Sequence, residues 1–185
     1  MKILLTISIL LWTISISNHR SEIKYEVCEH TLVDKINMWS QTITELTIPP
    51  EQFAKYCMIV FWCESGLNKY SKNGAQQSLF QMTSKTRIAL GIPDLQDCTE
   101  EELLDYYYVY LKATKKLHLV KTCLDLHVLN AAPSRFHYNN LLTVRGALSF
   151  IDYDKNNIIT KQDLLRFQEK RCKESRFIQL LILNK

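Results

Sequence analysis

The sequence lacks the short motifs that would mark a metal or thiol-redox centre. It contains no Cys-x-x-Cys and no His-Glu-x-x-His, and its five histidines are scattered, which leaves zinc and dithiol chemistry without support. It also lacks a long run of basic residues, so nucleic-acid binding is not indicated. Glycine is scarce: only four occur, and two of them, Gly66 and Gly74, fall in a polar segment from Ser65 to Ala75. That segment is predicted to be a loop.

What the chain does contain is enough apolar sequence for a core. Hydrophobic residues make up 46% and aromatic residues 10% of its 185 positions, which excludes a disordered or fibrous class. The length suits a single domain, expected over residues 18–172 with a C-terminal tail over 173–185. The formal net charge is +4, and a mildly basic surface suits an anionic polymer as partner.

The N-terminus has the pattern of a secretory signal peptide over residues 1–17. Lys2 precedes an apolar stretch from Ile3 to Ile16 and then polar residues, with Ser15 and Ser17 as small residues around a cleavage site. An uncleaved membrane anchor is the alternative, although a spanning helix needs roughly 20 apolar residues. In both cases we expect an exported protein, secreted or in the periplasm or cell envelope. Membrane contact is expected only through this segment if it is uncleaved.

Export leaves two roles open for the cysteines. An oxidising compartment would allow up to three disulfides, and six thiols can pair completely in 15 ways. Buried free thiols are the alternative, which the sequence supports equally well. Cys57 and Cys63 are poor mates if both lie on one helix, because six residues separate their Cα atoms by about 9 Å. The six positions are Cys28, Cys57, Cys63, Cys98, Cys123 and Cys172.

Hydrophobic spacing favours helices along most of the chain. Apolar residues recur three and four positions apart, and residues such as Pro50 and Thr99 fit the starts of helices. Helices are expected over residues 27–46, 50–64, 79 or 84 to 90, 99–117, 123–132 and 141–150, and after residue 163. No strand pattern of comparable quality is present. The predicted fold class is mainly α, and the apolar segment from Phe177 to Leu183 is expected to dock on the domain.

Glu64 ends the most apolar of these helices. Positions 53, 57, 60 and 64 recur with helical spacing, so Glu64 lies on the buried face. A carboxyl beside Phe61 and Trp62 should lose hydration and hold its proton near neutral pH. A general acid for glycosidic-bond cleavage needs that property. A lone glutamate at a helix end is, however, more often solvated or part of a turn, so the surrounding residues decide.

Those residues resemble the peptidoglycan lytic transglycosylases of the lysozyme-like superfamily. The family has a Glu-Ser pair, an Asn three residues after the Ser, a Gly-Ala, and a Gly-Leu-(Met/Phe)-Gln motif followed by Thr. This chain has Glu64-Ser65-Gly66-Leu67-Asn68, then Asn73-Gly74-Ala75, then Ser78-Leu79-Phe80-Gln81 and Thr86, ending on Leu90-Gly91. The resemblance implies a lysozyme-like domain and cleavage of the bond between N-acetylmuramic acid and N-acetylglucosamine to a 1,6-anhydro product.

The resemblance also implies roles for particular residues. Glu64 would be the sole acid and base, Ser65 would help to orient it, and Gln81 would line the glycan groove. The family's downstream Ala-Tyr-Asn-Ala-Gly motif is echoed by His137-Tyr138-Asn139-Asn140, which makes Tyr138 a candidate for substrate binding. Ser78 departs from the family, which has Gly there.

Other functions stay open beside that of a transglycosylase. A two-carboxylate hydrolase of the lysozyme type would need a second acid, for which three aspartates are candidates. A non-catalytic protein that binds the cell wall is the alternative from another class. The three aspartates are Asp94, Asp97 and Asp105.

A second motif, from Asp152 to Asp163, fits a 12-residue EF-hand calcium loop. Some phage and bacterial transglycosylase-like domains are similar in having such a loop just past the glycosidase core. A structural Ca²⁺ is expected there, and no cofactor is expected for catalysis; a metal-free turn leading into a helix is the alternative. The predicted ligands are Asp152, Asp154, Asn156, the carbonyl of Ile158 and Asp163, with Asn157 where the usual glycine stands.

Overall fold

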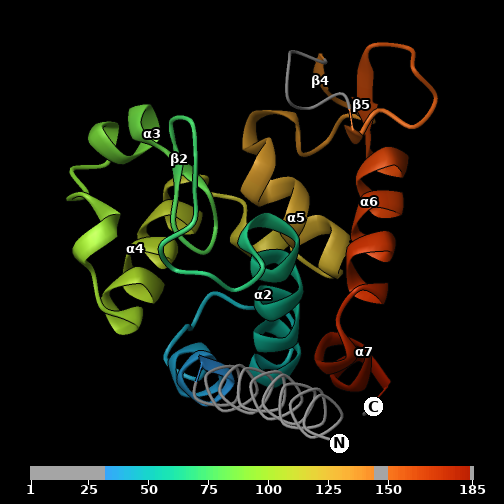
Figure 1. Cartoon of the computed structure of the whole chain (residues 1–185). Helices are drawn as coiled ribbons and strands as arrows, with labels where there is room; N and C mark the ends of the chain where they lie inside the picture. Colours follow the sequence, from blue (N-terminus) through green and yellow to red (C-terminus); the bar gives the residue numbers. More distant parts are fainter. Residues whose placement is uncertain (1–31, 144–149, 184–185) are drawn as a thin grey trace, which may run out of the picture. The chain divides into compact units, whose positions relative to one another are not determined.

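The computed structural model describes residues 32–143 and 150–183. Contacts divide the chain into two compact units, Met1–Asp34 and Lys35–Lys185. The described part of the second unit is mainly helical (Figure 1), which confirms the predicted class at that level. The predicted signal peptide over 1–17 and Cys28 lie outside the described residues. None of the helices described is long and apolar enough to cross a membrane.

Helices alternate with a few very short strands. A helix over residues 32–40 opens the described chain. The others are α2 (Pro50–Ser65), α3 (Ser84–Ala89), α4 (Glu100–Ala113), α5 (Cys123–Ala131), α6 (Lys161–Lys173) and α7 (Arg176–Leu183), with 3-10 turns η1 (Leu95–Asp97), η2 (Leu117–Leu119) and η3 (Pro133–Arg135). Strands β1 (Lys72–Asn73), β2 (Gln76–Gln77) and β3 (Met82–Thr83) form an antiparallel sheet in that order, and β4 (Asn140–Thr143) pairs antiparallel with β5 (Ile158–Thr160).

Helix α2 is central to the second unit. It contacts α5, α6 and α7, while α3, α4 and β2 lie to its other side in Figure 1. Its side chains Phe53, Val60 and Phe61 have no exposed surface, as the apolar spacing predicts. Burial of each such side chain contributes roughly 1.5–3 kcal/mol, so the helix that carries Glu64 is held firmly.

An aromatic cluster joins α2 to α4 and to the loop before β3. The ring centroids of Phe61 and Tyr107 are 5.0 Å apart in an edge-on arrangement, and those of Phe80 and Tyr107 are 4.8 Å apart. All three side chains are buried. Aromatic pairs at these distances stabilise a fold by about 0.5–1.5 kcal/mol beyond the burial of their surface. The cluster therefore fixes the loop before β3 against α2.

Three helices begin with the same local hydrogen-bond pattern, the capping box. In each, a threonine hydroxyl accepts the backbone N–H three residues on, and the acidic side chain at that position accepts the threonine N–H. The pattern explains why α4, α5 and α6 begin where they do, and it confirms the start predicted at Thr99. The pairs are Thr99 with Glu102, Thr122 with Asp125, and Thr160 with Asp163.

One predicted helix ends earlier than expected, and another was wrong. The helix expected over 27–46 ends at residue 40, where turns follow. The segment expected to be helical over 141–150 begins instead as strand β4, and residues 144–149 lie outside the described part. Only Leu141 of β4 is buried, so this short apolar run has one core-facing residue where a helix would need several.

The five described cysteines are free thiols. Two of them meet: Cys63 of α2 and Cys172 of α6 hydrogen-bond to each other in an apolar cluster with Ile59 and Ile178. Their contact and burial raise the pKa of Cys63, while the contact lowers the pKa of Cys172. The two thiols join α2 to α6 immediately before Glu64.

Candidate active site

Glu64 is the penultimate residue of α2. The helix ends because Gly66 adopts a left-handed conformation with φ 64°, and its N–H donates to the Trp62 carbonyl at 2.9 Å. Glycine takes this conformation without the steric cost that a Cβ would add. The local sequence therefore fixes the point at which the chain leaves the helix, just after the acid.

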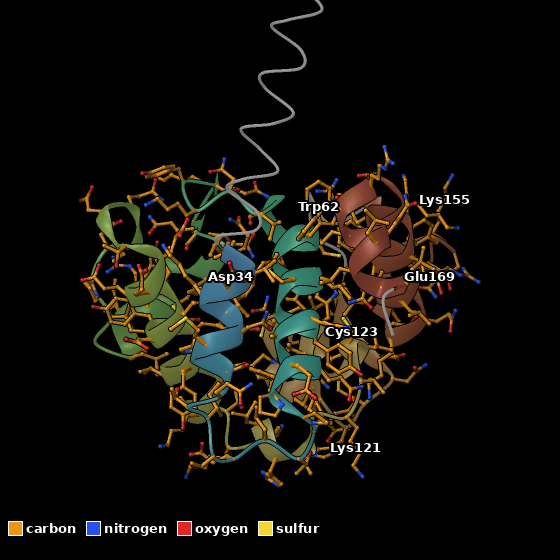
Figure 2. All side chains as sticks on the ribbon, turned by 90° about the horizontal axis from the view of Figure 1, so that it is seen from below. Asp34, Trp62, Lys121, Cys123, Lys155 and Glu169 are labelled. Carbon is orange, nitrogen blue, oxygen red and sulfur yellow. The ribbon has the colours of Figure 1, made fainter. Side chains whose placement is uncertain are left out.

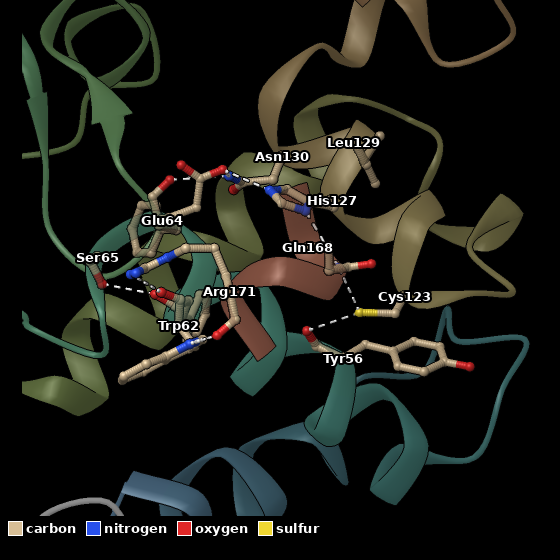
Figure 3. A network of polar contacts seen from close by, with 12 residues as sticks. Tyr56, Trp62, Glu64, Ser65, Cys123, His127, Leu129, Asn130, Gln168 and Arg171 are labelled. Carbon is tan, nitrogen blue, oxygen red and sulfur yellow. Dashed lines mark hydrogen bonds and ion pairs between the residues drawn. The ribbon is translucent and has the colours of Figure 1, made fainter. Parts of the chain in front are cut away.

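Two side chains of α5 contact the carboxyl of Glu64 (Figure 3). Asn130 donates from Nδ2 to Oε1 at 3.1 Å, and Nε2 of His127 lies 3.2 Å from the same oxygen. The Glu64 side chain is 19% exposed and that of His127 is 1% exposed, so a ligand can reach the acid but not the imidazole. Both contacts fall on Oε1, and no hydrogen bond within the described residues falls on Oε2.

Asn130 also joins the acid to the second half of the family motif. Its Nδ2 donates to the Phe80 carbonyl at 3.2 Å, so one amide spans Glu64 and the segment from Ser78 to Gln81. The hydroxyl of Tyr110 donates to the Asn130 carbonyl at 2.7 Å. Burial, and secondarily the charge of Glu64, raise the pKa of Tyr110, so this hydroxyl stays a donor and holds the last turn of α5.

Helix α6 contacts the end of α2 at Trp62, which Figure 2 labels. The indole Nε1 donates to the Arg171 carbonyl at 2.8 Å, and Nη2 of Arg171 donates to the Trp62 carbonyl at 3.3 Å. The guanidinium also stacks on the indole, 5.4 Å from the ring centroid, a favourable cation–π distance. The backbone two residues before the acid is thus fixed by reciprocal bonds.

The loop after Glu64 folds into the sheet β1–β2–β3. Gly74, with φ 61°, opens the two-residue turn between the paired residues Asn73 and Gln76, a position that favours glycine. Ser78 is buried with φ 73°, and its hydroxyl has no hydrogen-bond partner among the described residues. Glycine adopts such a φ freely, whereas another residue loses about 1–2 kcal/mol. The backbone at Ser78 is therefore one that glycine would adopt more readily.

Two of the predicted binding residues support the fold around the acid. The Ser65 hydroxyl donates back along α2 to the Phe61 carbonyl at 3.0 Å. Gln81 is buried, and its Nε2 donates to the carbonyls of Ser78 at 2.7 Å and Ser71 at 3.3 Å. None of these three hydrogen bonds involves the Glu64 carboxyl, so Ser65 braces the helix end and Gln81 braces the motif loop.

The structure brings Asn130, and not Tyr138, to the acid. Tyr138 is 58% exposed and stacks with the Arg135 guanidinium, 5.5 Å from its ring centroid. Asn130-Ala131, at the end of α5, resembles the Asn-Ala pair of the Ala-Tyr-Asn-Ala-Gly motif quoted above, with Leu129 in place of Tyr. That pair at the end of an apolar helix was a signal available in the sequence. His127 gave no comparable signal.

None of the three aspartates that the sequence offered as a second catalytic carboxylate makes a described hydrogen bond or ion pair with Glu64. Asp94 accepts the Gln96 N–H at 3.1 Å and so caps η1. Asp97 and Asp105 are exposed. The described ion-pair partner of Glu64 is His127, at 3.2 Å from Oε1.

The predicted calcium loop over 152–163 folds around its own backbone amides. Asp152 accepts the N–H groups of Asn156 at 3.2 Å and Asn157 at 2.9 Å, and Asp154 accepts the same Asn156 N–H at 3.2 Å. The two carboxylates therefore converge. Asn157 has φ 62°, the left-handed turn that an EF-hand loop makes at its sixth position.

The remaining predicted ligands are arranged differently. Asp163 accepts the Thr160 N–H at 3.0 Å and its hydroxyl at 2.6 Å. Burial acts to raise the pKa of Asp163, but these hydrogen bonds outweigh it and the pKa is lowered. Ile158 lies in β5 and donates its N–H to Asn156 Oδ1 at 2.7 Å. Among the described residues, no three His, Cys, Asp or Glu side chains lie close enough together to hold a metal ion.

No protein-family model, no curated protein sequence and no solved structure matches this chain. The resemblance to transglycosylases therefore rests on the motif residues from Glu64 to Gly91.

Proposed function

We propose that the protein is an exported lytic transglycosylase with a lysozyme-like fold. It cleaves the β-1,4 bond between N-acetylmuramic acid and N-acetylglucosamine in peptidoglycan, and Glu64 is its acid and base. One observation carries the proposal: a single part-buried carboxyl at a helix end is joined through the amide of Asn130 to the Phe80 carbonyl. The two halves of the motif that resembles the family, one around Glu64 and one around Phe80, thereby meet at the acid.

The arrangement suits a reaction that uses one carboxyl twice. Protonated Glu64 gives its proton to the leaving oxygen of N-acetylglucosamine while the bond from that oxygen to the anomeric carbon breaks. The 6-hydroxyl of N-acetylmuramic acid then bonds to the anomeric carbon and returns its proton to the Glu64 carboxylate. No water is consumed, and no second carboxylate is needed. Because Oε1 faces Asn130 and His127, the transferred proton belongs on Oε2.

The products distinguish this reaction from its rivals. Purified peptidoglycan would be digested with the protein, and the released muropeptides would be analysed by mass spectrometry before and after borohydride reduction. We expect anhydromuropeptides, which borohydride leaves unchanged. Muropeptides that gain two hydrogens on reduction would identify a hydrolase. Sedimentation with peptidoglycan but no release of fragments by the folded protein would identify a wall-binding protein.

We also propose that the loop over 152–163 binds a structural calcium ion. Converging carboxylates at Asp152 and Asp154 and the left-handed turn at Asn157 support the fit. Asp163 fits less well as it stands, because its carboxyl caps α6. With the ion bound, these oxygens would order the approach to α6, which braces α2.

Calcium is expected to raise the melting temperature. At a concentration 100 times the dissociation constant, one site adds about 2.7 kcal/mol, which is roughly 5–11 °C for a chain of this size. Differential scanning fluorimetry with Ca²⁺ and with Mg²⁺ measures it. The Asp154→Asn variant should lose the shift, and Asp97→Asn, outside the loop, should keep it. An unchanged wild-type melting temperature up to millimolar Ca²⁺ would contradict the proposal.

A further inference from the structure

His127 makes a polar contact through each of its two ring nitrogens. Nε2 lies 3.2 Å from Glu64 Oε1, and Nδ1 lies 3.4 Å from Nε2 of Gln168 on α6. The imidazole is 1% exposed and Gln168 is 6% exposed. A buried histidine between a reactive carboxyl and a buried amide has its protonation state set by those two neighbours.

The amide group of Gln168 identifies which ring nitrogen carries the proton. Its NH₂ group also lies 3.0 Å from the Cys123 sulfur, so its two hydrogens serve Nδ1 and that sulfur. An amide NH₂ only donates, and Nδ1 must therefore accept and carry no proton. The proton of the neutral ring then lies on Nε2, the ring nitrogen that faces Glu64 Oε1 in Figure 3.

The other ionisable groups near this ring do not reverse that assignment. Burial raises the pKa of the Cys123 thiol, which keeps it neutral. Arg171 is engaged by the Trp62 carbonyl and by Glu174. A second proton on Nδ1 would face the NH₂ group of Gln168 and break a hydrogen bond. The titratable and charged groups that α2, α5 and α6 bring to this region include Cys57, Cys63, Glu64, Cys123, Arg171 and Cys172.

We propose that Gln168 holds His127 in its neutral Nε2–H form, and that His127 is a positioning residue which orients Glu64 without charging it. This inference rests on the proposed function of Glu64 as an acid. A neutral donor fixes Oε1 by a hydrogen bond, whereas an imidazolium at the same place would stabilise the carboxylate and hinder proton transfer to substrate. A carboxyl that must hold a proton therefore benefits from a neutral partner.

The ring can be observed without any measurement of activity. Two-bond ¹H–¹⁵N correlation spectra of the uniformly ¹⁵N-labelled full chain distinguish the two neutral tautomers and the cation. We expect His127 to be in the Nε2–H form at pH 7, while the exposed His137 serves as an internal control. A wild-type His127 that is doubly protonated at pH 7, or that carries its proton on Nδ1, would overturn the inference.

Gln168→Glu tests the consequence for the reaction. A carboxylate at this position would accept from Nδ1 and make the ring a cation, so the alkaline limb of the pH profile for anhydromuropeptide release should move down by about one to three units. Gln168→Met keeps the volume and adds no charge, so it should move that limb by less than Gln168→Glu does, because only the hydrogen bond to Nδ1 is lost. An unmoved limb in a folded Gln168→Glu protein whose His127 is charged would overturn the positioning role.

The experiments distinguish a failure of the proposed function from a failure of the inference about His127. A wild type that cleaves no peptidoglycan yet shows the Nε2–H ring would remove the proposed function and leave the protonation state established. A wild type that releases anhydromuropeptides with a charged His127 would keep the function and remove the inference.

Discussion

Replacing Glu64 by glutamine is expected to lower the rate of anhydromuropeptide release by roughly 100-fold to 10,000-fold, the contribution of a positioned general acid. The substitution keeps the shape of the side chain, and its amide oxygen can still accept from Asn130 and His127, which both contact Oε1. The fold should therefore persist while proton transfer is lost. Timed digests followed by quantitative mass spectrometry measure the loss.

The matched control lies on the same helix. Glu51, in the first turn of α2, is exposed, so Glu51→Gln makes the same substitution far along α2 from Glu64 and should keep the wild-type rate. Circular dichroism and a melting curve verify that both variants fold. A Glu64→Gln protein that releases fragments within threefold of the wild-type rate would reject Glu64 as the acid.

Phe80→Ala is expected to destabilise the fold by about 3–5 kcal/mol, the usual cost of truncating a buried phenylalanine. Phe80 is 2% exposed and packs against both Phe61 and Tyr107, so its loss leaves a cavity at the junction of α2, α4 and the motif loop. For a chain of this size the melting temperature should fall by roughly 6–20 °C. Thermal unfolding followed by circular dichroism measures it.

An exposed phenylalanine supplies the control for that truncation. Phe150 is 59% exposed, with its ring centroid 5.6 Å from that of Phe167. Phe150→Ala should therefore cost no more than about 1.5 kcal/mol, the upper range for an aromatic pair. Equal effects of the two substitutions would mean that the aromatic cluster does not anchor the motif loop.

The sequence predicted best those features whose physical cause is local. Three-and-four spacing predicted α2 with Glu64 at its end, and Thr99 before three glutamates predicted the start of α4. Strand β4 was missed because a four-residue strand with one buried side chain has no readable period. Its pairing with β5 comes from a contact between distant segments, which no local pattern encodes.

The candidate site could be predicted only in part, again because some of its contacts join segments that are distant in the sequence. Glu64 could be found from its helix face and from the motif that follows it. The partners of its carboxyl could not: Asn130 and His127 lie more than 60 residues further along the chain, and a lone histidine in an apolar helix is usually a core residue. Ser78 was readable as a departure from the family, but its cause, a backbone with φ 73°, appears only in the structure.

The reciprocal bonds between Trp62 and Arg171 have a consequence for biosynthesis. They join residues 109 positions apart, so α2, which carries Glu64 near its end, lacks this brace until most of the chain has been made. Local helices form in microseconds, whereas contacts between such distant residues must await the later segment. A nascent or truncated chain that stops before α6 would thus carry Glu64 without this brace, and the proposed activity would arise late, when the last helices dock.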